Sequence, residues 1–445
     1  MAAYNTDVPR QEAIETTFSP PQRRVLLLCM FIALIDGFDI LAIGYVLPAI
    51  ASDWSVGPAS LSIAVSAGLV GMIVSSILFG QLGDRWGRRS IILIATPVFT
   101  LATLMTALAS SVEMLTVLRF VAGLGLGTIG PTVIALAAEY APASKRAITV
   151  VLVGSSIAFG GFIAGVSIAW IIPAFGWRAV FLIGAVLPMI GLALTARYLP
   201  ESVGFLATRA AKSGNDYEKR TSDTACHGTL EQVPPKDAMP DGVEQGGLAG
   251  LFSARFAIRT VLLWVVYFCG SLFAYFMFSW MPTILHSSGT SQGLAIYATS
   301  AMTLGTVVGG ILLALIADRK RYGFRLLSLG FLAGGVATIA LSVFIENLYL
   351  LLPLALLVGI TAMGSQAASN AVASTLYPVA IRSTGLGWAY GVGRVGSVVS
   401  PLLGGLLLAS SVEPSKVLMV AVVPAVVAAV AMAVIVARGV DNSAL

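Results

Sequence analysis

Long apolar runs separated by short polar segments dominate the pattern of this chain. Most runs reach about 20 residues, which is long enough for an α-helix to cross the ~30 Å hydrocarbon layer of a bilayer. Strict alternation of apolar and polar positions is absent, which excludes a transmembrane barrel. Because lipid leaves unpaired backbone groups unsatisfied, the runs must be helices. They predict twelve spans at residues 25–50, 61–82, 91–109, 114–138, 148–172, 179–199, 261–285, 294–317, 326–345, 348–376, 384–409 and 417–437.

A polar segment, residues 201–258, separates the first six spans from the last six. It is poor in aromatic and β-branched residues, as flexible linkers are. The two sets of six repeat each other. An Asp-Arg pair begins at Asp84 and again at Asp318, 234 residues later, and a Pro-x-x-x-Arg motif begins at Pro142 and again at Pro378, 236 residues later. Because each repeat has an even number of spans, both copies have the same orientation in the membrane. They are then related by an axis along the membrane normal.

The pattern therefore predicts an all-α polytopic membrane protein with two six-helix bundles related by a pseudo-twofold axis. Its expected parts are an N-terminal tail (1–24), a first bundle (25–200), a linker (201–258), a second bundle (259–437) and a C-terminal tail (438–445).

Composition and charge agree with a membrane protein and orient it. Charged residues make up 11% of the chain, against roughly 25% in soluble proteins. Of the 26 Lys and Arg residues, Arg119 and Arg394 lie deep inside spans and two others on the far side, leaving 22 on or near the side of the termini. The positive-inside rule then predicts cytoplasmic termini. Insertion in a lipid bilayer, with basic residues on the cytoplasmic side, explains the excess of Lys and Arg over Asp and Glu. No nucleic-acid partner is expected.

The loop after the second span carries a specific motif. Residues 80–89 read GQLGDRWGRR and match every fixed position of G-x-L-[AG]-D-[RK]-x-G-R-[RK], so the chain resembles the major facilitator superfamily. A carboxylate beside arginines at a helix end can hold two bundles together on the cytoplasmic side and favour one access state. A plain basic turn is the alternative interpretation. The residues expected to control switching are Gly80, Gly83, Asp84, Arg85, Gly87, Arg88, Asp318, Arg319, Glu139, Arg146 and Arg382.

Two acidic residues, Asp36 and Asp39, lie deep in the first span. They stand at i and i+3, so they share one face of the helix. A charge at that depth costs a few kcal/mol or more, which makes intramembrane carboxylates candidates for function. Desolvation and mutual repulsion favour protonation of at least one of them, as a proton carrier requires. A structural pair bonded to backbone or to arginine is the alternative.

Two arginines lie inside spans. Arg119 opens Arg-x-x-x-Gly-x-Gly-x-Gly in the fourth span, which resembles the second superfamily signature, and its glycines let helices approach closely. Arg394 lies in the eleventh span. Its planar guanidinium can bind a carboxylate through two parallel hydrogen bonds, from a substrate or from an aspartate. A structural role remains open for both arginines.

Polar and aromatic side chains share faces in two other spans, the seventh and the tenth, and also beside Arg394 in the eleventh. Such faces either line a cavity or pack against neighbours, and the pattern leaves both open. The candidate substrate-binding residues are Arg394, Arg119, Tyr267, Ser271, Tyr275, Gln366, Asn370, Trp388 and Tyr390.

No cofactor or metal site is expected. The two Gly-x-Gly-x-x-Gly runs, at residues 125–130 and 391–396, fall within predicted spans and do not follow a strand, as dinucleotide binding requires. Cys226 and His227 are adjacent in the linker, where two neighbouring ligands do not make a zinc site.

The segments Asp36-Gly-Phe-Asp39, Ile43-Gly-Tyr45 and Gly393-Arg394-Val-Gly396 look like those of the aromatic acid:proton symporter family. The resemblance runs over nearly the whole chain except the linker. It implies uptake of an acid such as benzoate, hydroxybenzoate, protocatechuate or gentisate, with Asp36 and Asp39 required. A monomer and alternating access are expected, with either one or two protons per substrate.

Three other functions stay open at this stage. The chain could carry another organic anion or a sugar with protons, or it could export its substrate. A membrane enzyme is disfavoured because the two histidines are isolated rather than clustered with other catalytic groups, and a sensor is disfavoured because the linker is too short for an output domain.

Overall fold

The computed structural model describes residues 18–202, 205–206, 248–253, 256–319, 323–373, 376–410 and 412–438, and every regular element in these ranges is helical. The first half contains α2 (Pro20–Trp54), α3 (Pro58–Trp86), α4 (Arg88–Thr106), α5 (Val112–Tyr140), η1 (Ala143–Lys145) and α6 (Arg146–Tyr198). The second half contains α9 (Leu248–Leu251), α10 (Ala257–Ser287), α11 (Gln292–Arg319), α12 (Gly323–Val343), α13 (Leu348–Val358), η3 (Gly359–Met363), α14 (Gly364–Ala373), α15 (Val379–Ala409), α16 (Pro414–Val420) and α17 (Val422–Ala437).

Eleven helices within the described ranges are long and apolar enough to cross a membrane. One of them, α6, has 53 residues, and a straight helix of that length would span about 80 Å, more than twice the hydrocarbon thickness. Its backbone leaves the helical region at Gly176, with φ 76° and ψ 172°. Gly176 lies between the two spans that the sequence predicts here.

Two other predicted spans are interrupted. The π-helical segment η3 divides the tenth predicted span, where a side chain at Gly359 would overlap the backbone of Met302 on α11. The break between α16 and α17 falls just after Val420, four residues before Pro424, whose ring clashes with the carbonyl at that position in a continuous helix.

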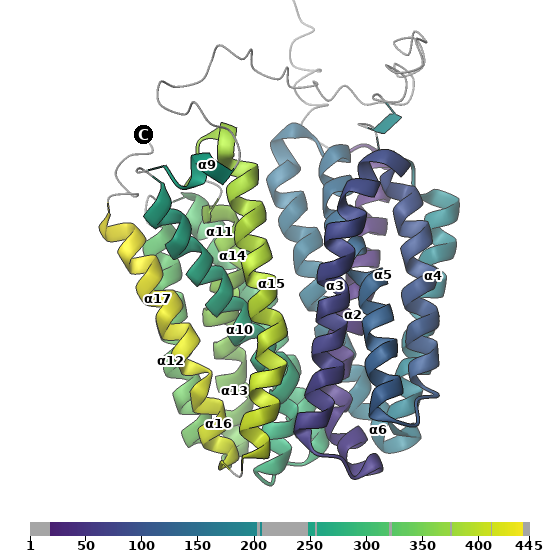
Figure 1. The fold of residues 1–445 in the computed structure, drawn as a ribbon, viewed down its shortest axis with the longest axis vertical. Coiled ribbons are helices and arrows are strands. Elements are labelled where there is room, and N and C mark those ends of the chain that lie inside the picture. The colour runs from purple at the N-terminus through teal and green to yellow at the C-terminus, as the bar shows by residue number, and fades with distance from the viewer. Residues whose placement is uncertain are drawn as a thin grey trace, which may run out of the picture.

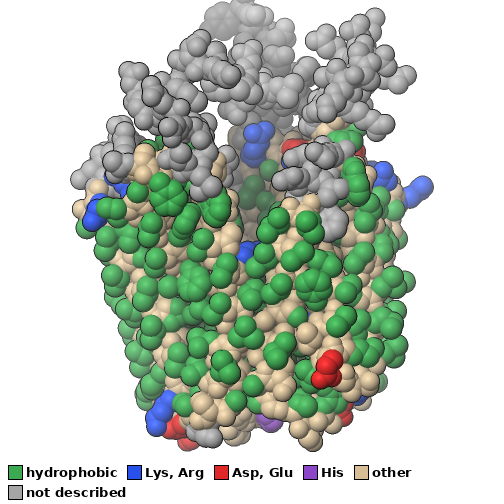
Figure 2. Space-filling view, in the orientation of Figure 1, with side chains coloured by type: hydrophobic (Ala, Val, Ile, Leu, Met, Phe, Trp, Pro, Cys, Tyr) green, Lys and Arg blue, Asp and Glu red, His purple; other side chains and the backbone are tan. Residues whose placement is uncertain are grey.

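The helices of the first half lie together on one side of the molecule and those of the second half on the other (Figure 1). The halves touch at the end where α2 finishes and α3 begins, which we name the closed end. There the hydroxyls of Tyr45 and Thr303 lie 3.4 Å apart, and Gly405 packs on Ser62. Figure 2 shows apolar side chains over the flanks, charged side chains at the two ends, and a hollow between the halves at the opposite end.

Candidate functional site

Asp36 and Asp39 face the interior of the first half because of a glycine between them. A side chain at Gly37 would overlap the backbone oxygen of Ile157, so α2 rests directly on α6 at this point. The opposite face of α2, which carries both aspartates, turns toward α4 and α5. Both carboxyl side chains are buried, with 3% of Asp36 and 4% of Asp39 exposed.

Asp39 has a complete set of partners. Its Oδ2 lies 3.5 Å from Nη1 of Arg119, and its Oδ1 accepts a hydrogen bond of 2.8 Å from Thr103. The Nη2 of Arg119 donates to Thr106 over 3.2 Å, and the guanidinium lies 5.1 Å from the ring centre of Phe181. Each oxygen of Asp39 and each terminal nitrogen of Arg119 thus has a partner, while Nε of Arg119 is buried without one among the described residues. This pair lies entirely within the first half.

Asp36 has very different surroundings, although it is only three residues away. Its Oδ1 is buried without a hydrogen-bond partner among the described residues. The positive charge of Arg394, on α15 of the second half, attracts it, and the negative charge of Asp39 repels it. Tyr275 on α10 experiences the charges of both Asp36 and Arg394. Asp36 of the first half and Arg394 and Tyr275 of the second half thus form one electrostatic group.

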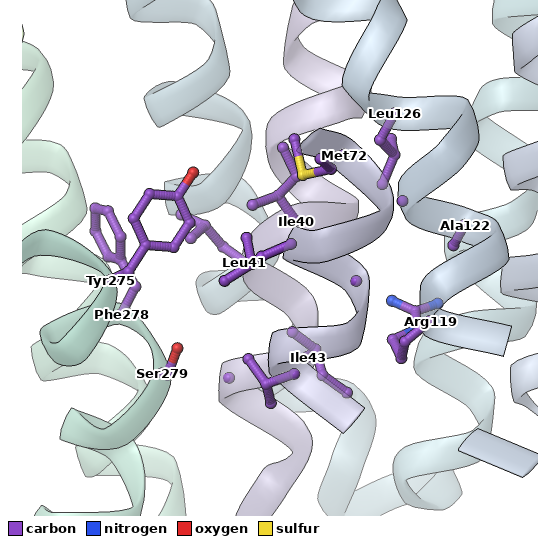
Figure 3. Close-up of a pocket in the computed structure, with 15 residues that line it drawn as sticks. Ile40, Leu41, Ile43, Met72, Arg119, Ala122, Leu126, Tyr275, Phe278 and Ser279 are labelled. Carbon is purple, nitrogen blue, oxygen red and sulfur yellow. The ribbon is translucent and has the colours of Figure 1, made fainter. Parts of the chain in front are cut away.

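A pocket lies next to this group, between α2, α3 and α5 of the first half and α10 of the second. Figure 3 shows Arg119 on one wall and Tyr275, Phe278 and Ser279 on the opposite wall. Most of the lining is apolar and includes Met72 and Leu126. An apolar, ring-lined cavity with a few polar groups is the usual form of a small-molecule site. A flat ring bearing a carboxylate fits this chemistry.

Arg394 reaches the pocket from the second half. Its Nη1 lies 3.9 Å from the sulfur of Met72, a pocket residue on α3. Within the described ranges it has no ion pair, so its guanidinium is available to a ligand.

A second polar wall forms on the second half. Tyr267 donates a hydrogen bond of 2.6 Å to Oδ1 of Asn370, and the ring of Tyr390 meets the ring of Tyr267 edge-on with centres 5.4 Å apart. Gln366 lies against Gly270, and its Oε1 is buried without a partner among the described residues.

Ser271 belongs to the same wall, because its hydroxyl faces Gly393 on α15. The structure thus brings together five of the sequence-predicted side chains: Tyr267, Ser271, Gln366, Asn370 and Tyr390.

Trp388 lies in a different place from the other predicted substrate residues. It stacks on Trp264 with ring centres 5.8 Å apart, and Trp264 meets Phe252 edge-on. Its side chain is 44% exposed. Trp388 therefore belongs to an aromatic cluster near α9 rather than to the pocket.

The loop that carries the 80–89 motif is tied down within the first half. Arg88 makes an ion pair of 2.7 Å with Glu139 on α5, and Ser202 donates to the other oxygen of Glu139. Gly87 has φ 90°, and a side chain there would overlap the carboxylate of Glu201. The same carboxylate accepts the backbone N–H of Arg89 over 2.9 Å.

The structure describes only some of the other residues predicted to control switching. Gly80, Gly83, Asp84 and Arg85 end α3, and Asp318 and Arg319 end α11, but their side chains fall outside the described part of the chain. Arg146 is exposed at the start of α6. Arg382 donates to the backbone oxygen of Tyr377 over 3.3 Å. A contact between this loop and the second half therefore stays a prediction.

Sequence reasoning missed several residues of these sites. Thr103, Thr106 and Phe181 surround the Asp39–Arg119 pair, and Glu201 holds the loop. A signal for the threonines exists, because Thr96, Thr100 and Thr103 recur at helical spacing and form one polar face in an apolar span. Nothing in the local sequence marks Phe181 or Glu201.

The chain is similar to known transporters over most of its length. The family model of the Major Facilitator Superfamily matches residues 29–365 and 263–444. The 4-hydroxybenzoate transporter PcaK of Acinetobacter baylyi is 32% identical over 92% of this chain and 90% of that protein. The gallate transporter of Pseudomonas putida is 33% identical over 86% of this chain and 85% of that protein.

Among solved structures, a bacterial homologue of the human lysosomal transporter Spinster, in an inward-facing and occupied conformation, has the same fold. The TM-score is 0.73, with 95% of this chain and 98% of that chain covered. The sequence identity is 15%, so this likeness concerns the fold alone.

Proposed function

Since the chain belongs to the aromatic acid transporters of the major facilitator superfamily, we propose that it imports an aromatic carboxylate together with protons. The observation that carries the proposal is the placement of Asp36. A buried carboxyl oxygen of the first half, without a hydrogen-bond partner among the described residues, experiences the positive charge of Arg394 on the second half. Such a group can take up and release a proton as the halves move.

The proposed topology has twelve crossings in two six-helix bundles, with α6 counted as two spans divided at Gly176. Both termini and the linker lie in the cytoplasm, in the inner membrane of a bacterium, and one chain is the working unit. The charge distribution supports this orientation. In this topology the closed end faces outward, and the hollow in Figure 2 opens toward the cytoplasm.

In the proposed cycle, a proton from the outside neutralises Asp36. The carboxyl group then no longer attracts the guanidinium of Arg394. The arginine then binds the substrate carboxylate, and the ring lies in the pocket beside Tyr275 and Phe278. After the halves rock, Asp36 loses its proton to the cytoplasm and again attracts Arg394, which releases the acid. Asp39 stays paired with Arg119 throughout. One proton accompanies one monoanion, so the pH gradient alone drives uptake.

The test uses purified protein in proteoliposomes with an imposed inward pH gradient. Labelled 4-hydroxybenzoate, gallate, benzoate and gentisate are offered to the wild type, to Asp36→Asn and to a control, Asp53→Asn. Asp53 is on the same helix but exposed at its far end. We expect gradient-driven accumulation of at least one acid by the wild type and the control. Asp36→Asn mimics the protonated state, so it should keep counterflow exchange and lose accumulation.

The role of Arg394 is tested in the same vesicles. A charge-assisted hydrogen bond contributes about 1.5–3 kcal/mol, so Arg394→Gln should raise the KM for the acid roughly 10- to 100-fold. Accumulation that persists in Asp36→Asn would remove Asp36 from proton coupling. Failure of all four acids to accumulate, with a folded wild type, would point to another organic anion, a sugar or export.

A further inference from the structure

A second concavity lies away from the pocket between the halves. It is a groove between the first turns of α2 and the last turns of α6, with about 850 Å³ of open space. It shares no lining residue with the pocket beside Arg119. The residues that line it are Pro20, Arg23, Arg24, Leu27, Leu28, Phe31 and Leu194.

The groove combines a charged entrance with an apolar floor. Arg23, Leu27 and Phe31 stand four residues apart and follow one another along one face of α2. Leu194 on α6 forms the facing wall, and Leu27 is 64% exposed despite its apolar side chain. None of the lining residues is acidic. The groove is therefore positively charged at one end and lined by apolar side chains elsewhere.

Both arginines are held in place but keep donors free for a ligand. Arg23 uses its Nε to donate to the backbone oxygen of Phe18 over 3.0 Å, which leaves its two terminal nitrogens. The guanidinium of Arg24 lies 5.9 Å from the ring centre of Tyr198. Neither arginine has a carboxylate partner within the described ranges. Two adjacent guanidinium groups are well suited to bind the oxygens of one phosphate.

We infer that this groove binds an anionic phospholipid. The headgroup phosphate lies between Arg23 and Arg24, and an acyl chain runs along Leu27, Phe31 and Leu194. The apolar floor favours a lipid over free phosphate, because an inorganic ion would leave that surface unused. Basic pockets between membrane helices on the cytoplasmic side bind anionic headgroups in this way.

The inference is independent of which acid is transported, but it has a consequence for transport. The helix that forms the groove, α2, also carries Asp36 and Asp39. A lipid on its first turns contacts the same rigid element that moves with the first half. We therefore expect faster uptake in vesicles that contain an anionic lipid.

The primary test is native mass spectrometry of detergent-purified protein with phosphatidylglycerol or phosphatidylethanolamine. Three proteins are compared: the wild type, Arg23→Gln/Arg24→Gln, and the control Arg325→Gln, which removes a basic residue of the second half. We expect the wild type and the control to retain phosphatidylglycerol in preference to phosphatidylethanolamine. The double variant should bind phosphatidylglycerol at least tenfold more weakly and lose that preference, with an unchanged elution volume.

Two further measurements separate a lipid from free phosphate. Leu27→Ser interrupts the apolar floor without touching the arginines, so it should weaken phosphatidylglycerol binding. Millimolar inorganic phosphate should compete poorly with the lipid. Complete displacement by phosphate, or full binding by Leu27→Ser, would overturn the lipid assignment. Equal binding of phosphatidylglycerol by the double variant and the wild type would overturn the site itself.

Discussion

The two aspartates of α2 differ in what surrounds them rather than in depth or exposure. Asp39 is bound to Arg119 and Thr103, while Asp36 has an oxygen without a partner in the described structure and experiences the charge of Arg394 of the other half. Removal of one member of a buried ion pair leaves an uncompensated charge, which is strongly destabilising. Removal of an unpaired carboxyl leaves no such charge behind.

This difference predicts opposite effects of two similar substitutions on stability. Asp39→Asn should lower the free energy of unfolding by about 3–5 kcal/mol, because Arg119 loses its counter-ion. Asp36→Asn should be neutral or stabilising. Thermal unfolding of the purified proteins in detergent measures both.

The double variant Asp39→Asn/Arg119→Gln is the control for this comparison. It removes both charges, so it should recover part of the lost stability. Equal loss in Asp36→Asn and Asp39→Asn would contradict the assignment of distinct surroundings.

At the scale of elements, the connection between α3 and α4 is held by contacts that only glycine permits. Gly87 combines a positive φ with direct contact to the Glu201 carboxylate, which also receives the N–H of Arg89. The adjacent Arg88 pairs with Glu139. The start of α4 is thereby fixed to the ends of α5 and α6, and the first half moves as one unit at this end.

Gly87→Ala should disturb this connection in two ways. An alanine at positive φ costs about 1–2 kcal/mol, and its methyl group displaces Glu201. We expect a lower melting temperature and a several-fold slower uptake. The control is Gly57→Ala, since a side chain at that exposed turn meets no atom within 4 Å. A Gly87→Ala protein with wild-type stability and uptake would show that the connection tolerates a side chain.

At the scale of the whole molecule, the contact between the halves at the closed end depends on small residues. A side chain at Gly44 on α2 would overlap the backbone oxygen of Phe278 on α10. The overlap is with backbone, so no side-chain rotation relieves it. The balance between access states therefore rests on backbone packing as well as on charge.

Gly44→Ala should push the halves apart at the closed end and shift the population toward the other access state. Ser62 on α3 is 2% exposed there, so a cysteine at this position reports the change. We expect several-fold faster labelling of Ser62→Cys by an impermeant maleimide in the Gly44→Ala background.

Gly391→Ala is the matched control, because a side chain at this helical glycine of α15 meets no atom within 4 Å. It should leave the labelling rate unchanged. Unchanged labelling in Gly44→Ala as well would contradict the role of this contact.

The sequence by itself determined the helical class, the family and most candidate residues, because bilayer thickness and backbone hydrogen bonding act along the chain. Helix positions follow from apolar length, and buried charges such as Asp36, Asp39 and Arg119 stand out against apolar neighbours. The repeat of the two halves is also visible along the chain, because an Asp-Arg pair begins at Asp84 and again at Asp318. The family was confirmed by the comparisons.

Only the tertiary structure decided which polar groups meet. Asp39 and Arg119 are 80 residues apart, and their pairing depends on how α2 and α5 are rotated against each other. That rotation is set by close backbone contacts such as Gly37 on Ile157. The same packing places Trp388 beside Trp264 and brings Asp36 within the electrostatic influence of Arg394. These relations lie between helices, and a pattern read along one helix does not contain them.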